Sequence, residues 1–284
     1  MEIGIGLPNT LPVNGPVLVD WARRAEERGF AMVATIDRIV YPNYDSLTSL
    51  ALAAGATTRI GLLTDILLTP LYQPVWLAKA TASLHAASGG RLTLGLGVGG
   101  RPDDFAAMNR DMGRRGRLMD ETLDILDRGW AGESVTGDEF GVVPEPAAGH
   151  AVPVLIGGTS DATIRRVTRH AEGWTAGGGG PAMAAPMVER VRAAWREAGR
   201  DGEPRIAALA YFGLGDEAES RASLRRYYGF LGDWVDAIVE SAVRSPEAAK
   251  ELVREYADVG VTELALMPTV ASVDEVDRLA DAVL

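Results

Sequence analysis

The amino-acid sequence predicts an α/β protein, a (β/α)₈ barrel that uses residues 1–284 as a single domain. Short apolar segments, each followed by a helical pattern, recur eight times along the chain, and eight such units build this barrel. The clearest segment, Leu92–Leu96, is apolar on both faces, bounded by glycines and placed between two helical runs, as expected of a buried parallel strand. A doubly wound open sheet is the alternative, but no glycine fingerprint follows the first segment.

The predicted strands are short apolar runs that end at glycine, proline or polar residues. In chain order they are Ile3–Leu7, Ala31–Ile36, Arg59–Leu63, Leu92–Leu96, Pro153–Ile156, Gly173–Ala176, Arg205–Phe212 and Thr262–Met267. The third is expected to end at Thr64–Ile66, where polar residues interrupt the apolar sequence. Because such runs are buried on both faces, we expect helices on the outside of the sheet.

Between the strands, apolar residues recur at the three- and four-residue spacing of a helix that buries one face. The predicted helices are Val17–Arg28, Leu47–Thr57, Val75–Ala87, Arg114–Trp130, Ala162–Ala171, Met183–Ala198, Glu217–Tyr228, Asp233–Arg244, Pro246–Val259 and Val273–Leu284. Gly29 is expected to end the first one. The tryptophans at apolar helix positions, Trp76 among them, are expected to pack inside. The glycine-rich segment Ala131–Val152 predicts an excursion with one short hairpin.

Composition excludes several classes of protein. The chain has no cysteine, which excludes disulfides, thiolate catalysis and cysteine-ligated metals. The three histidines do not have the spacing of metal ligands. A net charge of −11 argues against nucleic acid or an anionic membrane as the main partner. No signal peptide or spanning segment is expected, and a cytoplasmic protein is the default.

Candidate functional residues follow the predicted strands. In a barrel these strand ends open on one face, which holds the site. They are Asn9, Asp37–Arg38, Thr64–Asp65, Val98–Arg101, Gly157–Thr159 and Gly177–Gly180. Gly157-Gly158-Thr159-Ser160 opens a helix, so its free amides predict an anion site, most simply for phosphate. The alternative is a plain turn capped by Ser160 or Asp161. Three glycine-rich ends together favour a large flat ligand with a phosphate tail.

Several motifs in a fixed order resemble the bacterial luciferase-like family. They are Asp37–Pro42, Thr57–Leu62, Pro74–Lys79, Ser88–Gly97, Arg115–Glu121, Gly157–Gly158 and Ala171–Trp174. The likeness covers about residues 1–180 well and the remainder only in pattern. This family comprises flavin-dependent monooxygenases and deazaflavin-dependent oxidoreductases on a (β/α)₈ TIM barrel.

The resemblance implies roles for particular residues. The cofactor-binding residues would be Asp65, Ile66, Val98, Gly99, Gly100, Gly157, Gly158, Thr159 and Gly177. Gly157–Thr159 would hold the cofactor's phosphate, and Val98–Gly100 would lie along its ring. Asp65–Ile66 matches a position where the family often has a non-proline cis peptide. Asp37 would be an acid near the reacting ring, whereas Arg38 replaces a histidine that deazaflavin-dependent members often carry.

The leading functional hypothesis is a monooxygenase. Reduced FMN, supplied by a separate flavin reductase, would react with oxygen and transfer one oxygen atom to a small organic substrate. The alternative is an oxidoreductase that transfers hydride with the deazaflavin coenzyme F420. A third hypothesis is a non-catalytic flavin-binding or partner subunit.

Two further expectations concern Asp37 and the outer helices. Asp37, at the mouth of the barrel, is a candidate catalytic acid–base group, and the alternative is that it only caps the loop or pairs with an arginine. The helices Leu47–Thr57 and Val75–Ala87 carry few charges, although outer barrel helices need a polar outward face. We therefore expect a homodimer that forms through them.

Overall fold

The structure, a computed structural model, describes residues 1–135, 137, 141–144 and 151–284. Eight parallel strands form a closed barrel in which each strand pairs with the next one in the sequence and β8 returns to β1. The closing pair joins Ile3 to Leu264 and Ile5 to Leu266. The predicted (β/α)₈ barrel is therefore confirmed, and the open-sheet alternative is wrong.

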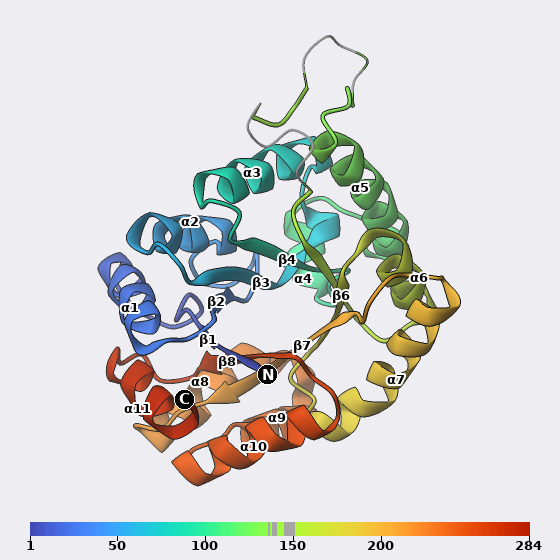
Figure 1. Cartoon of the computed structure of the whole chain (residues 1–284). Helices are drawn as coiled ribbons and strands as arrows, with labels where there is room; N and C mark the ends of the chain where they lie inside the picture. Colours follow the sequence, from blue (N-terminus) through green and yellow to red (C-terminus); the bar gives the residue numbers. More distant parts are fainter. Residues whose placement is uncertain (136, 138–140, 145–150) are drawn as a thin grey trace.

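The strands surround the centre of the view in Figure 1. They are β1 (Glu2–Gly6), β2 (Met32–Thr35), β3 (Gly61–Leu68), β4 (Leu92–Gly97), β5 (Val154–Gly157), β6 (Gly173–Ala176), β7 (Arg205–Phe212) and β8 (Glu263–Pro268). Most of their residues are buried, because side chains fill the inside of the barrel and helices cover its outside.

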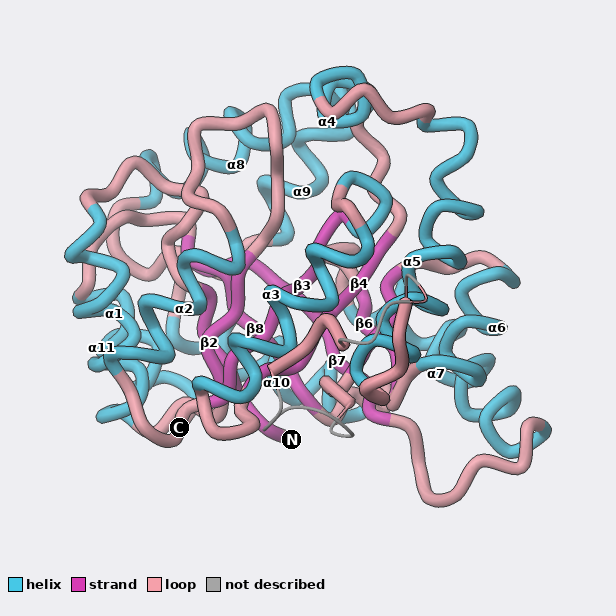
Figure 2. The backbone as a smooth tube through the Cα atoms, turned by 90° about the horizontal axis from the view of Figure 1, so that it is seen from above, coloured by secondary structure: helices cyan, strands magenta, loops and turns pink. Residues whose placement is uncertain are grey.

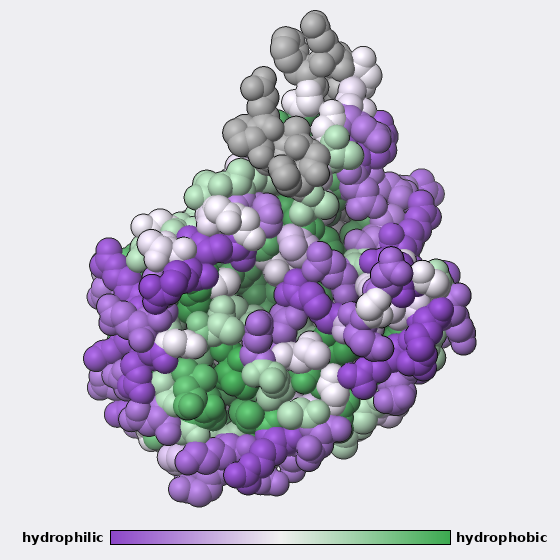
Figure 3. Space-filling view, viewed as in Figure 1, coloured by the Kyte–Doolittle hydropathy of each residue, from purple (hydrophilic) through white to green (hydrophobic). Residues whose placement is uncertain are grey.

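The larger helices form a ring outside the barrel (Figure 1). The helices are α1 (Gly15–Arg28), α2 (Ser46–Ala56), α3 (Pro74–Ala87), α4 (Pro102–Ala107), α5 (Arg115–Trp130), α6 (Asp161–His170), α7 (Pro181–Glu197), α8 (Glu217–Tyr228), α9 (Val235–Ser241), α10 (Pro246–Asp258) and α11 (Asp274–Val283), with 3₁₀ turns η1 (Thr69–Leu71), η2 (Met112–Arg114) and η4 (Gly229–Trp234). Hydrophilic side chains gather on the outer rim over α1 and α10, with hydrophobic ones inside it (Figure 3).

Local sequence signals account for the helix ends. In α1, Leu18 and Trp21 are buried, and Gly29 ends the helix with a left-handed φ of 91°, as predicted. α2 begins at Asp45, whose carboxylate accepts a hydrogen bond from Thr48 N at 2.7 Å.

The third strand differs from its prediction. β3 continues through Thr64–Ile66 to Leu68 and contains a cis peptide bond between Asp65 and Ile66. The polar residues do not end the strand, because their side chains find partners inside the barrel. Thr64 Oγ1 donates a hydrogen bond to Gly95 O at 2.9 Å.

Several other expectations need correction. Trp76 is 54% exposed on α3 instead of packed inside. α4 was not predicted, and the helix expected at Asp233–Arg244 is shorter, because η4 precedes α9. The hairpin expected within Ala131–Val152 falls partly outside the described residues, and the described residues of this segment form no strand.

The two ends of the barrel have different roles. Both chain termini lie at one end, whereas α4 and α8 lie at the other (Figure 2). At the amino ends of the strands, Arg205 forms ion pairs with Glu263 at 2.7 Å and Glu172 at 3.0 Å. The carboxyl ends open towards α4 and α8, at the end that holds the site in such barrels. No helix in the described part of the chain is long and apolar enough to cross a membrane.

Candidate active site at the mouth of the barrel

Two adjoining cavities lie at the carboxyl ends of the strands. The large mouth cavity, of about 430 Å³, includes Thr159 and Met183 in its lining. The small mouth cavity, of about 180 Å³, includes Asp37 and Asp65. The residues that line both are Gly177, Gly178, Tyr211 and Tyr228. The two cavities therefore adjoin at these four residues and present different chemical groups of the protein.

Ile66 lines the small mouth cavity and projects towards β4 and β5. A Cβ atom at Gly97 would collide with Ile66 Cδ1, and one at Gly157 would lie 3.3 Å from Ile66 Cγ2. At Gly95, a Cβ atom would collide with the carbonyl oxygen of Thr64. Gly95 and Gly97 therefore make room for β3 and do not open the backbone to a ligand.

Asp65 is 6% exposed and lines the same cavity. Its Oδ1 accepts a hydrogen bond from Thr175 Oγ1 at 2.8 Å. Its Oδ2 is buried without a hydrogen-bond partner among the described residues. Burial raises the pKa of Asp65 to about 7, although the bond from Thr175 opposes this shift. A buried polar atom without a partner marks a place where a ligand donor can bind.

Asp37 follows β2 and is 3% exposed. Its Oδ2 accepts hydrogen bonds from Leu68 N at 3.0 Å and from Tyr72 OH at 2.9 Å. Burial raises the pKa of Asp37 to about 6, against these two bonds, which lower it. The structure thus places the buried carboxyl of Asp37, with its raised pKa, at the small mouth cavity. Hydrogen bonds from β3 and Tyr72 hold one of its two oxygens.

Arg38 is paired with acidic residues of α4. Its Nε lies 2.9 Å from Asp104 Oδ2, and its Nη2 lies 3.0 Å from Asp103 Oδ2. Asp104 is fully buried and also accepts hydrogen bonds from the backbone amides of Ile39 and Val40. Arg38 therefore fixes the loop after β2 against α4, and Asp37 does not pair with it.

The predicted phosphate-binding residues connect β5 to α6. Ser160 is the N-cap, and its Oγ accepts a hydrogen bond from Thr163 N at 3.2 Å. Thr159 is exposed and lines the large mouth cavity. Gly158 has a φ of 113°, which disfavours any side chain. The turn is therefore capped, and Thr159, one residue before the N-cap, connects α6 to the large mouth cavity.

The remaining glycine-rich ends differ in their access to the cavities. A Cβ atom at Gly177 or Gly100 would meet nothing within 4 Å, and both residues line the small mouth cavity. Val98 packs against the main core, and a Cβ at Gly99 would lie 3.4 Å from Leu68. The described lining of the two cavities includes neither Val98 nor Gly99.

Sequence reasoning missed the aromatic segment, which we define as Tyr227, Tyr228 and Phe230 at the end of α8. The hydroxyl groups of Tyr228 and Tyr211 are hydrogen-bonded, and both residues line the two cavities. The available signal was three aromatic residues within four positions at the end of a predicted helix. Such clustering is unusual on a solvent-exposed helix face.

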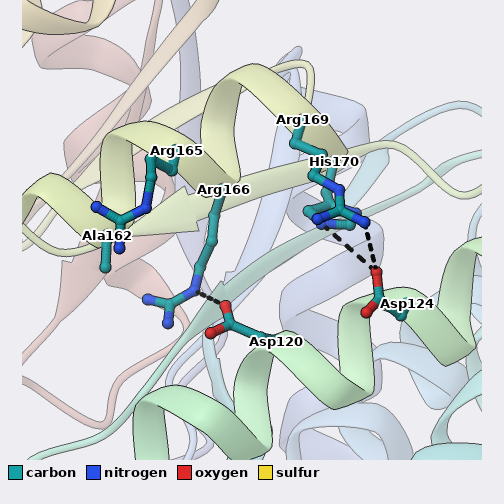
Figure 4. Close-up of a pocket in the computed structure, with 7 residues that line it drawn as sticks. All are labelled: Asp120, Asp124, Ala162, Arg165, Arg166, Arg169 and His170. Atoms are coloured by element: carbon teal, nitrogen blue, oxygen red, sulfur yellow. Dashed lines mark hydrogen bonds and ion pairs between the residues drawn. The ribbon is translucent and has the colours of Figure 1, made fainter.

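Another cavity, of about 300 Å³, lies on the outer surface between α5 and α6. Figure 4 shows Arg166 directed at Asp120, and Arg169 and His170 directed at Asp124. These ion pairs neutralise most of the charged side chains that line this outer cavity. The described lining of the outer cavity includes no residue from the end of a strand. We therefore assign the active site to the mouth of the barrel.

Known proteins resemble this chain in sequence. An uncharacterised protein of Mycobacterium tuberculosis is 31% identical over 225 residues, which cover 68% of this chain and 76% of that protein. The F420-dependent glucose-6-phosphate dehydrogenase of Nakamurella multipartita is 32% identical over 185 residues, covering 58% of this chain and 53% of that enzyme.

The fold and the family also match. An F420-dependent secondary alcohol dehydrogenase, solved with an F420–acetone adduct, superposes with a TM-score of 0.81 at 17% identity, covering 99% of this chain and 98% of that one. This likeness concerns the fold. The sequence pattern of the luciferase-like monooxygenase family matches residues 1–265. This is the family that the sequence motifs resemble. By this match over most of its length, the chain belongs to the luciferase-like monooxygenase family.

Proposed function

We propose that the protein is a deazaflavin-dependent oxidoreductase that transfers hydride between coenzyme F420 and a small organic substrate. The observation that carries this proposal is Asp37, a buried carboxyl whose pKa is raised to about 6, at a cavity of about 180 Å³. A group with such a pKa can hold or release a proton near neutral pH. The F420-dependent relative supports the choice of cofactor.

The residues at the mouth fit a cofactor of this kind. The amino end of α6 and Thr159 would hold its phosphate at the large mouth cavity. Gly177 leaves the backbone open between the two cavities, where a flat ring system would pass. The unpartnered Asp65 Oδ2 would accept a hydrogen bond from the ring, beside Ile66. When bound, the deazaflavin supplies or accepts the hydride.

Asp37 would move the proton that accompanies the hydride. Oxidation of an alcohol releases a proton from its oxygen, and reduction of a carbonyl requires one there. Asp37 Oδ2 is held by Leu68 N and Tyr72 OH, so Oδ1 is the oxygen available to the substrate. Leu68 and Tyr72 therefore orient this carboxyl, and Ile66 and Tyr211 limit the access of water to the cavity.

A monooxygenase that uses reduced FMN is the second candidate. The description of the matched family as monooxygenases supports it, and the amino end of α6 would serve the phosphate of FMN equally well. In that case a separate flavin reductase would supply the reduced cofactor.

Equilibrium titration of the purified protein with F420, and separately with FMN, tests the choice. The proposal predicts saturable binding of F420 and hydride exchange with small alcohols or carbonyl compounds without oxygen. Binding of FMN alone, with oxygen consumed in turnover, would overturn it in favour of the monooxygenase. Failure to bind either cofactor would support a non-catalytic subunit.

A further inference from the structure

Arg101 is a cation at the mouth of the barrel that the proposed function does not use. It lies between β4 and α4 and lines the small mouth cavity. Among the described residues its guanidinium forms no ion pair and donates a single hydrogen bond, from Nη1 to Tyr227 O at 3.1 Å. Because a guanidinium carries five N–H donors, most of them are available to a ligand.

The aromatic segment surrounds the Arg101 guanidinium. Its Cζ lies 3.9 Å from the ring centroid of Phe230, 4.6 Å from that of Tyr227 and 5.6 Å from that of Tyr228. Aromatic faces attract a cation, but they do not satisfy its N–H groups as a carboxylate does. Burial at this position lowers the pKa of Arg101, as expected of a cation that lacks a counter-charge.

Arg38, the other cation of the small mouth cavity, pairs with Asp103 and Asp104. The two carboxyls of the cavity, Asp37 and Asp65, accept hydrogen bonds from neutral groups of β3, Tyr72 and β6. Burial raises the pKa of both carboxyls, which favours their neutral forms. Within the described part of the chain, Arg101 is therefore the cation of this cavity that forms no ion pair.

We propose that Arg101 binds the carboxylate of a small organic acid, and that such acids are the substrates of this enzyme. This inference rests on the proposed function and names its class of substrate. A planar guanidinium donates two parallel N–H bonds to a carboxylate, which fixes the acid in one orientation. Leu209 and Tyr211 line the same cavity and offer apolar surface to the remainder of the molecule.

The size of the cavity limits the acid. A volume of about 180 Å³ corresponds to roughly six water molecules at ~30 Å³ each. Without the cofactor, an acid of a few carbons, or one with a single aromatic ring, fits this space. A cofactor ring at Asp65 and Ile66, which line the same cavity, would leave less of it to the acid.

The position of Arg101 separates it from the proposed phosphate site. Arg101 lines the small mouth cavity, whereas Thr159, at the amino end of α6, lines the large one. The substrate carboxylate and the cofactor phosphate would therefore be held in different cavities. Because both anions suit a guanidinium, the experiment has to distinguish them.

Benzoate and its neutral analogue benzyl alcohol are suitable probes, titrated into the purified protein with and without saturating F420. The proposal predicts that Arg101→Met weakens benzoate binding at least ~10-fold, the scale of a lost charge-assisted hydrogen bond. It should change benzyl alcohol binding less than about 2-fold, because that probe carries no charge. Arg101→Lys retains the cation and should retain part of the preference for benzoate.

Arg165→Met is the matched control, since Arg165 is exposed on α6 and lines the outer cavity. It should leave both probes unaffected. Equal loss of benzoate and benzyl alcohol binding in Arg101→Met would show that Arg101 only holds the aromatic segment, and would overturn the proposal. So would wild-type protein that does not prefer benzoate.

Two cofactor titrations complete the test. Arg101→Met should bind F420 and the deazaflavin riboside that lacks its phosphate tail with the same ratio of affinities as the wild type. A selective loss of F420 binding would assign Arg101 to the cofactor phosphate and overturn the substrate role. If the wild type binds neither F420 nor FMN, the proposed function fails, whereas the preference for benzoate is measured independently.

Discussion

At the scale of single residues, the candidate site depends on hydrogen bonds between distant parts of the chain. Asp37 and Arg38 were recognisable in the sequence because they follow an apolar strand. Their partners were not recognisable, because they are far away in the sequence. Tyr72, the partner of Asp37, lies 35 positions after it, and Asp104, the partner of Arg38, lies 66 positions after it. Since these partners were unknown, the sequence left open whether Asp37 pairs with an arginine.

The role of Asp37 predicts a change in turnover and in its pH dependence. Asp37→Asn should bind the cofactor normally and turn over at least ~10²-fold more slowly, the usual scale for a lost acid–base group. It should also remove the limb of kcat/KM near pH 6 that the pKa of Asp37 produces. Tyr72→Phe should move that limb to higher pH, because the Tyr72 hydrogen bond lowers this pKa. Near-normal turnover of Asp37→Asn with a confirmed substrate would remove Asp37 from the catalytic residues.

The raised pKa of Asp65 makes the stability of the folded chain depend on pH. Burial raises its pKa to about 7 in the folded chain, against ~3.9 when unfolded. The folded state therefore binds this proton more tightly, and the contribution of Asp65 to stability falls as the pH rises from about 4 to about 7. Asp65→Asn should raise Tm most above pH 7 and least near pH 4. Asp20→Asn, at an exposed site, is the control. A Tm difference for Asp65→Asn that is independent of pH would show that the pKa of Asp65 is not raised in the folded chain.

Among the strands and helices, the sequence predicted where the strands lie better than it predicted what individual glycines in them do. The run Leu92–Leu96 was correctly interpreted as a strand because apolar residues occupy both of its faces. The glycine-rich end that follows it was assigned to ligand access, whereas Gly95 and Gly97 accommodate β3. Only the packing of β3 against β4 distinguishes them from Gly100, which lies in open space.

This distinction predicts opposite outcomes for two substitutions in the same stretch. Gly95→Ala should destabilise the fold by ~1–3 kcal/mol, because the added methyl group collides with the backbone carbonyl oxygen of Thr64, which cannot turn aside as the end of a side chain can. Gly100→Ala should change stability by less than ~0.5 kcal/mol, since nothing lies within 4 Å of its Cβ position. Chemical denaturation of both variants measures the difference. Equal stabilities would mean that β3 does not pack against Gly95 as described.

At the scale of the whole molecule, the outer surface is uneven. The rim is hydrophilic over α1 and α10 but white to pale green over α3 in Figure 3. On α2 and α3, Leu52 is 40% and Trp76 54% exposed, and Trp76 stacks on Tyr72 at 6.3 Å between ring centroids. The sequence indicated this apolar surface through the low charge of both helices, although it placed Trp76 inside.

We propose a homodimer in which α2 and α3 of two copies pack together. Burial of Leu52 and Trp76 would stabilise it. Light scattering at micromolar concentration should give twice the mass of the chain for the wild type and the single mass for the double variant Leu52→Glu, Trp76→Glu. Leu284→Glu, at another exposed apolar residue, should remain dimeric. A monomeric wild type would refute this proposal.

The central claim is that the mouth of the barrel binds a phosphate-bearing deazaflavin at the amino end of α6. Gly158 is unsuitable for testing it, because its positive φ makes any substitution disruptive. Thr159→Asp instead places a carboxylate at the large mouth cavity, whereas Ala248→Asp places one at an exposed position in the first turn of α10, outside the lining of both mouth cavities.

Titration of F420 into these two variants and the wild type is the most direct measurement. We expect saturable binding to the wild type, at least ~10-fold weaker binding to Thr159→Asp because like charges meet, and wild-type affinity for Ala248→Asp. Equal affinities for all three proteins, or no binding to the wild type, would show that the amino end of α6 does not hold the phosphate of the cofactor.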